Sequence, residues 1–322
     1  MRFRDLSLPD LAAALRQTGI FYRIGPFSIH LETALPELPP VLHRLYSDFS
    51  LLDSDGFADF HVRLVSPHGP RALWRSRTRF LIDDASHFAP FPREIALALL
   101  EWGLNWCVFK RAHQYLMIHA GVVEKNGHAL IMPARPGSGK STLCAALAYR
   151  GWRLLSDEFA LVRPEDLTVV PFPRLIPLKN ESIPVMRQRV PEQAMGPTLP
   201  RTRKGTVVHL CPPTDSIRRS GEVARAGQIL FPTYTGGQPL RFEPLGKSQT
   251  FLRLTANSFN YEAIGLRGFE TMSALAGHWP GAEFSYGDLD EAMEYLENLL
   301  PRAAPPAPSV ADQGEVPAMP SR

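Results

Sequence analysis

The stretch Ala134-Arg135-Pro136-Gly137-Ser138-Gly139-Lys140-Ser141-Thr142 decides the fold that we expect for this chain. A short apolar run over residues 129–132 precedes it, and a helical pattern over residues 141–149 follows it. A strand, a glycine-rich loop and a helix in this order are typical of a loop that holds a phosphate group. The sequence therefore predicts an α/β sheet whose ligand lies at the carboxyl ends of the strands.

The residue types of this loop suit the triphosphate of ATP. Glycine permits the backbone angles and the close approach that let successive N–H groups surround a β-phosphate, and the following helix directs its positive end at the same anion. We expect Lys140 to reach the β and γ oxygens and the Ser141 hydroxyl to bind Mg²⁺. The predicted ATP-binding residues are Pro136, Gly137, Ser138, Gly139, Lys140, Ser141 and Thr142.

One position of the loop departs from the usual pattern G-x-x-x-x-G-K-[ST]. Ala134 stands where that pattern has its first glycine. Pro136 is expected to stiffen the loop instead, because its ring fixes one backbone angle.

Two adjacent carboxylates, Asp157 and Glu158, follow the apolar residues Leu154 and Leu155. They lie 17 positions after Lys140 (157 − 140). If one helix joins two neighbouring parallel strands here, both acids lie beside the loop. One acid could then hold Mg²⁺ and the other could accept a proton from an incoming hydroxyl or water. The alternative is a solvated acidic pair that ends a strand.

A histidine precedes the loop at the end of an apolar strand. His119 lies 21 positions before Lys140 (140 − 119). A lone histidine in such a place is often structural. Its strand leads through a hairpin into the loop, so the sequence equally predicts that His119 faces the γ-phosphate.

The remainder of the chain divides into three parts. Residues 1–107 predict an α+β domain with a helix beginning near Asp10, and its role stays open. Its other predicted elements are strands at 27–31, 60–65 and 72–82 and a helix at about 92–109. Residues 108–300 hold the loop, and the turn Asn126-Gly127 predicts a hairpin between strands at 116–123 and 129–132. Residues 301–322 are rich in Pro and Ala, which predicts a disordered tail.

Composition limits the class of protein. The hydrophobic fraction of 44% and the charged fraction of 21% are ordinary for a chain with a packed core. A net charge of +3 does not call for nucleic acid or an anionic membrane as partner. Three cysteines in no metal or disulfide pattern favour the cytoplasm. No apolar stretch approaches the roughly 18 residues of a membrane span.

The spacings from His119 to Glu158 resemble the catalytic core of the HPr kinase/phosphorylase superfamily, whose phosphate loop is similar to that of phosphoenolpyruvate carboxykinase. The stretches 177–182, 202–206 and 257–261 are similar to those of HPr-kinase-related kinase A. The resemblance implies a P-loop kinase core of this type over residues 108–300.

The resemblance also implies roles. Lys140 and Ser141 would bind nucleotide and metal, and Asp157 would act as general base toward the acceptor hydroxyl. Glu158 would be the Mg²⁺ ligand, and His119 would assist Asp157. The family pattern has a second aspartate where this chain has Glu158, and the Glu-x-Arg-Gly-Leu-Gly signature of true HPr kinases is missing. HPr as substrate and the reverse reaction are therefore not carried over.

Two basic residues of the later loops, Lys179 and Lys204, are predicted anion contacts, chiefly from the resemblance. Their charges could also be solvated in the loops.

The predicted function is an ATP- and Mg²⁺-dependent kinase of a Ser or Thr hydroxyl in a protein or peptide. The alternative is a P-loop ATPase or a nucleotide-switched binding module, in which Glu158 would activate water. The short spacing between Lys140 and Asp157 favours the kinase. The acceptor stays open, and the resemblance allows a homo-oligomer.

Overall fold

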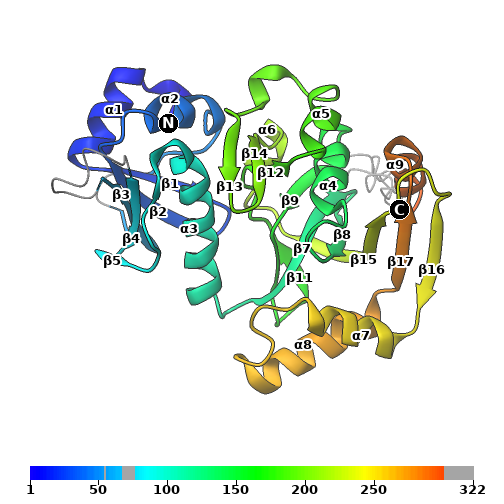
Figure 1. Cartoon of the computed structure of the whole chain (residues 1–322). Helices are drawn as coiled ribbons and strands as arrows, with labels where there is room; N and C mark the ends of the chain where they lie inside the picture. Colours follow the sequence, from blue (N-terminus) through cyan, green and yellow to red (C-terminus); the bar gives the residue numbers. More distant parts are fainter. Residues whose placement is uncertain (54–55, 67–76, 301–322) are drawn as a thin grey trace, which may run out of the picture.

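The computed structural model describes residues 1–53, 56–66 and 77–300, which form a mixed α/β protein with several sheets (Figure 1). This confirms the predicted α/β class. The predicted tail at 301–322 and the first part of the predicted strand at 72–82 lie outside the described residues.

The N-terminal unit is built on a sheet in the order β1-β2-β3-β4-β5, with β6 paired to β4. Strand β3 alternates buried and more exposed residues, as predicted, and β4 pairs with it in antiparallel fashion. The elements are α1 (Leu8–Gln17), β1 (Ile20–Ile24), β2 (Phe27–Thr33), α2 (Leu38–Leu45), β3 (Phe60–Val65), β4 (Arg77–Ile82), β5 (Ala85–Ser86), β6 (Phe91–Pro92) and α3 (Ala96–Arg111), with 3-10 turns at Phe3–Asp5 and Arg93–Ile95.

Two helix starts differ from the sequence prediction. Helix α1 is capped by Ser7, whose hydroxyl accepts the N–H of Asp10 at 3.2 Å, so the cap lies three residues before the predicted one. Helix α3 begins at Ala96 because Phe91 and Pro92 are held in a strand against β4. It ends at Arg111 and so runs through the predicted boundary between residues 107 and 108.

The large sheet carries the glycine-rich loop. Its order is β11-β10-β7-β8-β15-β17-β16, and β9 also pairs with β7. Strands β8, β15 and β17 are parallel, whereas β7 and β16 are antiparallel to their neighbours. The elements are β7 (Leu116–Lys125), β8 (His128–Pro133), α4 (Lys140–Tyr149), β9 (Arg153–Ser156), β10 (Phe159–Val162), β11 (Thr168–Val170), β15 (Ala224–Tyr234), β16 (Arg241–Leu245), α7 (Lys247–Ala256), α8 (Gly265–His278), β17 (Gly281–Tyr286) and α9 (Leu289–Glu297).

The hairpin between β7 and β8 corrects one expectation about the sheet. Asn126 and Gly127 both have positive φ, at 56° and 82°, as a tight two-residue turn requires. This turn places β7 directly beside β8. Strand β9 therefore pairs with the far edge of β7. The strands joined by α4 are parallel to each other but are not neighbours, and β7 lies between them.

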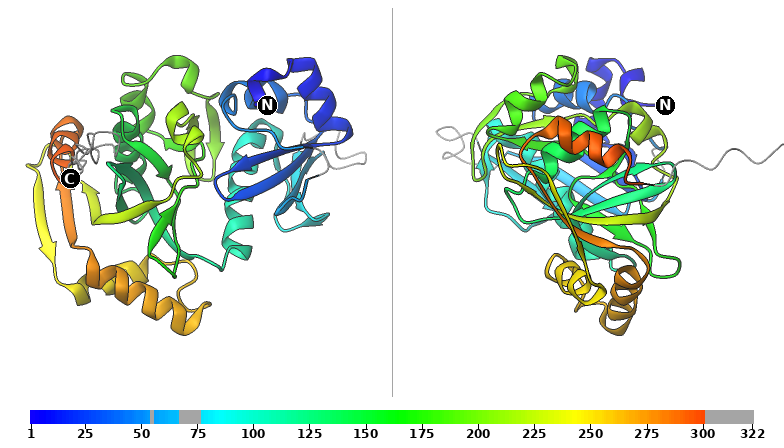
Figure 2. Two further views of the ribbon diagram at one scale, coloured as in Figure 1. Left: turned by 180° about the vertical axis from the view of Figure 1, so that it is seen from behind. Right: turned by 90° about the vertical axis from the view of Figure 1, so that its right-hand side faces the viewer.

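Helices cover both faces of the large sheet (Figure 2). On β8, Leu130 and Met132 pack in the core that contains α4 and α9, whereas Ala129 and Ile131 pack in the core that contains α7 and α8. Successive strand residues point to opposite faces, so one apolar strand supplies both cores. This packing fixes the start of α4 at the carboxyl end of β8.

A third, small sheet in the order β12-β14-β13 lies between the large sheet and the N-terminal unit (Figure 1). Phe172, Leu175 and Leu199, which precede or enter it, belong to the same core as α3. The division of the chain into separate domains stays a prediction. The remaining elements are β12 (Ile176–Lys179), α5 (Ser182–Arg187), β13 (Leu199–Thr202), β14 (Gly205–Leu210) and α6 (Thr214–Arg218), with a 3-10 turn at Glu192–Ala194.

Among the described residues, every helix is too short or too polar to cross a membrane.

Candidate active site

The glycine-rich loop joins the carboxyl end of β8 to the first turn of α4. Gly137 and Gly139 have positive φ, at 89° and 86°. Helix α4 begins at Lys140, and no side chain caps its first turn. The first N–H groups of a helix have no acceptor within the helix, so these are available to an anion. Ala134 is buried and does not have positive φ, which explains why alanine is tolerated where the usual pattern has glycine.

The ends of two parallel strands support this loop. The N–H of Tyr234 on β15 donates to the Ser138 carbonyl at 2.9 Å. The hydroxyl of Tyr286 on β17 donates to the Gly139 carbonyl at 3.3 Å. The side-chain oxygens of Ser138 and Thr235 are buried and have no partner among the described residues. Strands β15 and β17 thus hold the backbone of the loop, while the hydroxyl groups of Ser138 and Thr235 stay without a partner among the described residues.

We expect Gly139→Ala to weaken the predicted binding of ATP at least tenfold. A Cβ at Gly139 would lie 2.7 Å from the Tyr286 hydroxyl and 2.9 Å from Cβ of Tyr234. Positive φ adds roughly 1–2 kcal/mol for a residue with a side chain. Gly137→Ala is the matched control, because its φ is also positive but its Cβ would meet nothing within 4 Å. Titration calorimetry with ATP and Mg²⁺ measures both. Equal losses would show that the contact with Tyr286 does not matter.

Lys140 and Ser141 both contact Asp157. The Lys140 Nζ donates to the Asp157 carbonyl at 2.7 Å, and the Ser141 hydroxyl donates to Oδ2 of Asp157 at 2.9 Å. Lys140 is 7% exposed and Asp157 is 5% exposed. Gly121 on β7 makes room for this arrangement, since a Cβ there would lie 3.1 Å from Cγ of Lys140. The loop and the first acid therefore meet, as the sequence predicts.

Burial raises the pKa of the Asp157 carboxyl from 3.8 to about 6, although the nearby charge of Lys140 lowers it. The negative charge of Glu158 acts in the same direction as burial. Oδ1 of Asp157 is buried without a hydrogen-bond partner among the described residues. A carboxylate of this pKa exchanges protons near neutral pH. Its free oxygen can also accept a metal ion or a hydroxyl proton.

Glu158, unlike Asp157, lies against His119. Nε2 of His119 is 3.7 Å from Oε1 of Glu158 and 3.3 Å from Nζ of Lys140. Burial, together with the charge of Lys140, lowers the pKa of His119 to about 4, so its ring is neutral near pH 7. Burial alone would raise the pKa of Glu158, but the charge of Lys140, together with those of Lys204 and Lys179, lowers it below 4.5. Glu158 is therefore ionised.

The position of β7 explains why these groups meet. His119 lies on this strand, between β8, which leads to the loop, and the acids that link β9 to β10. The resemblance implies that His119 assists Asp157. Among the described residues, the ring of His119 makes its polar contacts with Lys140 and Glu158 rather than with Asp157. The backbone of His119 donates to the Asn257 carbonyl at 2.7 Å, and its ring packs on Phe259.

The residues present fit Mg²⁺ bound together with a nucleotide. Within residues 1–53, 56–66 and 77–300, no group of three or more His, Cys, Asp or Glu side chains could hold a metal by itself. Mg²⁺ is commonly held by one or two carboxylates, substrate phosphates and water. The Ser141 hydroxyl, the unpartnered Oδ1 of Asp157 and the ionised Glu158 suit that coordination.

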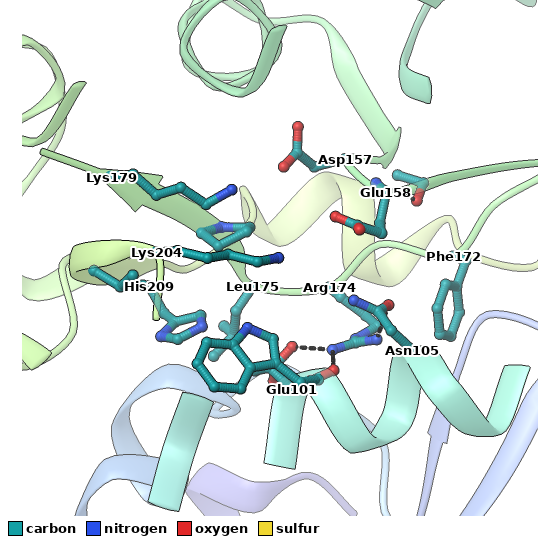
Figure 3. Close-up of a pocket in the computed structure, with 14 residues that line it drawn as sticks. Glu101, Asn105, Asp157, Glu158, Phe172, Arg174, Leu175, Lys179, Lys204 and His209 are labelled. Atoms are coloured by element: carbon teal, nitrogen blue, oxygen red, sulfur yellow. Dashed lines mark hydrogen bonds and ion pairs between the residues drawn. The ribbon is translucent and has the colours of Figure 1, made fainter. Parts of the chain in front are cut away.

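A pocket extends from the two acids to the N-terminal unit (Figure 3). Its empty space is about 530 Å³, including the part open to solvent. Lys179 at the end of β12 and Lys204 in the turn between β13 and β14 both line it with Asp157 and Glu158. Burial and the charge of Lys204 lower the pKa of Lys179 below 10.5. The structure thus brings both predicted anion contacts to the acids.

Sequence reasoning missed the opposite wall of this pocket. Glu101, Trp102 and Asn105 of α3 line it, together with Arg174 and His209. Arg174 forms a buried ion pair with Glu101 and donates to Asn105 at 2.5 Å. A glutamate within the otherwise apolar segment Ala96-Leu97-Ala98-Leu99-Leu100-Glu101-Trp102 was the available signal, because a buried charge needs a partner.

Comparison with known proteins gives no match, either to a family model or to a curated protein.

Proposed function

We propose that this protein is an ATP- and Mg²⁺-dependent kinase that transfers the γ-phosphoryl group to a Ser or Thr hydroxyl of a protein or peptide. The observation that carries the proposal is the meeting of Lys140, Ser141 and Asp157 at the start of α4. A phosphate loop touching a buried carboxylate of raised pKa suits phosphoryl transfer, which depends on positioning and charge neutralisation.

The loop would bind the triphosphate. The N–H groups of the first turn of α4 would bind the β-phosphate, and Lys140 would neutralise charge on the β and γ oxygens. Bound Mg²⁺ would neutralise the β and γ oxygens further. The side chains that would hold it are Ser141 and Glu158, as the resemblance implies, and Oδ1 of Asp157 is a further candidate.

Asp157 would act as general base. The acceptor oxygen forms a bond to the γ-phosphorus while the bond from that phosphorus to the β–γ bridging oxygen breaks. ADP leaves with the electron pair, and the hydroxyl proton passes to the Asp157 carboxylate and then to solvent. Lys179 and Lys204 line the same pocket and would stabilise negative charge on the transferring group or on the acceptor.

The proposal includes the family. The spacing from His119 to Glu158 and the contacts of Lys140 and Ser141 with Asp157 support a P-loop core of the HPr kinase type, and HPr-kinase-related kinase A is the proposed subfamily. A cytoplasmic location, a protein or peptide acceptor and a homo-oligomeric state are parts of the same proposal, and neither nucleic acid nor a membrane is expected as a partner.

The test is incubation with γ-labelled ATP and Mg²⁺, with and without lysate of the source cells. We expect label on a protein or peptide, and we expect Lys140→Ala to remove it and to weaken ATP binding about tenfold. Lys247→Ala is the control, since Lys247 is exposed at the start of α7 and is not among the site residues. Release of free phosphate alone, lost in Glu158→Gln, would instead support the ATPase. Absence of ATP binding would refute both.

A further inference from the structure

Among the described residues, the two lysines of the pocket make no close ion pair with an acid, although Asp157 and Glu158 line the same pocket and their charges act on Lys179. Among the described residues, neither Lys179 nor Lys204 forms an ion pair through its ammonium group. The Lys204 Nζ lies over the Trp102 ring of α3, 5.9 Å from its centroid. Lys179 is half-buried, and its pKa is lowered. Two unpaired positive charges in one pocket repel each other, and an anion between them would remove that cost.

The lysines occupy different parts of the pocket. The charges of both lysines lower the pKa of Glu158 and of His119, and the charge of Lys179 also lowers that of Asp157. Figure 3 shows Lys179 pointing toward Asp157, while Lys204 extends below it toward the centre of the pocket. Lys179 therefore lies on the side of Asp157, and Lys204 lies on the side of Trp102 and α3.

The floor of the pocket offers further unpaired polar groups. His209 is 0% exposed, and both ring nitrogens lack a partner among the described residues. Burial lowers its pKa to about 4, so the neutral ring offers one donor and one acceptor. Nε of Arg174 is likewise buried without a partner there. The guanidinium itself is held by Glu101 and Asn105.

These groups together fit an acceptor with an anionic end. Asp157 would take the proton of the acceptor hydroxyl. Lys204 and His209 line the same pocket on the side of Asp157 that faces α3 (Figure 3). An interior serine of a protein would bring neutral amides to this part of the pocket. Lys204 is exposed in the free protein, and neutral amides packed over its ammonium group would remove water without supplying a counter-charge, which is unfavourable. A carboxylate a few bonds from the hydroxyl would pair with Lys204 and accept a hydrogen bond from the ring N–H of His209.

We propose that the pocket between α3 and the β12–β14 sheet binds a phospho-acceptor that carries a free carboxylate a few bonds from its hydroxyl. The shared chemistry is that of a hydroxy acid, supplied by a small molecule or by the C-terminal residue of a peptide. The proposal rests on the proposed kinase function. The N-terminal unit, whose role the sequence leaves open, contributes the far wall of the acceptor pocket through Glu101, Trp102 and Asn105.

The experiment uses four probes with the full chain, ATP and Mg²⁺. They are free L-serine, free L-threonine, and one short peptide ending in serine, prepared as the C-terminal acid and as the C-terminal amide. Phosphorus NMR detects the phosphate ester. We expect at least one carboxylate probe to accept phosphate, with kcat/KM at least tenfold above that of the amide. Transfer to the free amino acids or to the peptide acid identifies which source the pocket takes.

Two variants in the turn between β13 and β14 test whether Lys204 binds the carboxylate. Lys204→Ala should raise KM for the carboxylate probe at least tenfold, by more than it raises the Kd for ATP. Arg203→Ala is the matched control: it removes the same charge from the adjacent position, where Arg203 lies over Phe91 outside the pocket lining. It should leave KM unchanged.

Two outcomes overturn the inference alone. One is equal kcat/KM for acid and amide, and the other is labelling of a lysate protein while no carboxylate probe accepts phosphate. In both cases ATP binds and the kinase proposal stands. If ATP does not bind, the kinase proposal and this inference fail together.

Discussion

Replacing Asp157 with asparagine is expected to lower kcat for phosphoryl transfer by about 10²–10⁴-fold, the usual contribution of a general base. Asparagine keeps the size of the side chain, and its carbonyl can still accept from the Ser141 hydroxyl. It cannot take the acceptor proton. ATP binding should change much less than kcat, because Lys140 contacts the backbone carbonyl of residue 157. Steady-state kinetics with a Kd measurement for ATP separates the two.

The pH profile gives an independent check of this role. Because the pKa of Asp157 is about 6, kcat/KM of the wild-type protein should rise with pH through about 6 and then level off. The residual activity of Asp157→Asn should lack this rise. Glu158→Gln is the control, and its profile should keep the rise, moved to lower pH because the negative charge of Glu158 helps to raise the pKa of Asp157. A rise lost in Glu158→Gln but kept in Asp157→Asn would exchange the two roles.

Asp157→Asn should also stabilise the protein. The folded-state pKa of Asp157 lies above its ordinary value of 3.8. The native protein therefore holds a proton that the unfolded chain releases, and the free energy of unfolding falls as pH rises from about 4 to about 6. Asparagine does not titrate, so Asp157→Asn should be more stable than wild type above pH 6, on the order of 2–3 kcal/mol. Urea unfolding at pH 4 and pH 8 measures this, and a gain at pH 4 alone would contradict it.

The loop and its nearest acid could be predicted because they rest on short-range patterns. Gly137 and Gly139 have the positive φ that the glycine pattern implies, and Asn126 and Gly127 form the predicted turn. The 17-residue spacing between Lys140 and Asp157 spans one short helix, so the two had to return to the same edge of the sheet.

The sheet order could not be predicted in the same way. The spacing is equally compatible with β9 beside β8 and with β9 beyond β7, and pairing between strands decides. The hairpin occupies the free edge of β8 and sends β9 to the far side of β7. That placement brings His119 to Glu158 rather than to Asp157.

The wall of the pocket that α3 forms could not be predicted from the sequence for a related reason. Glu101 and Arg174 are 73 positions apart and belong to different units of the chain. Neither stands in a motif, and their pairing follows from the packing of α3 against the segment before β12. An acid within an apolar helix indicates that a buried charge will need a partner. The sequence does not show which residue that partner is.

Breaking this buried pair should be the most destabilising single change among those considered. Arg174 and Glu101 have side chains 8% and 4% exposed, and the Tyr46 hydroxyl also donates to Glu101. Arg174→Met leaves the Glu101 carboxylate buried without its counter-charge, which costs about 3–5 kcal/mol of unfolding free energy. The double variant Arg174→Met with Glu101→Gln should lose less, because no charge is then left buried.

An exposed ion pair supplies the matched control for this prediction. Arg267 pairs with Glu165 at the surface, where the side chains are 48% and 58% exposed. Arg267→Met should cost less than about 1 kcal/mol, because water already screens that pair. Urea unfolding at pH 7 measures all three variants. If Arg174→Met costs no more than Arg267→Met, the pair does not hold α3 against the segment before β12, and this wall of the pocket must be fixed by apolar packing instead.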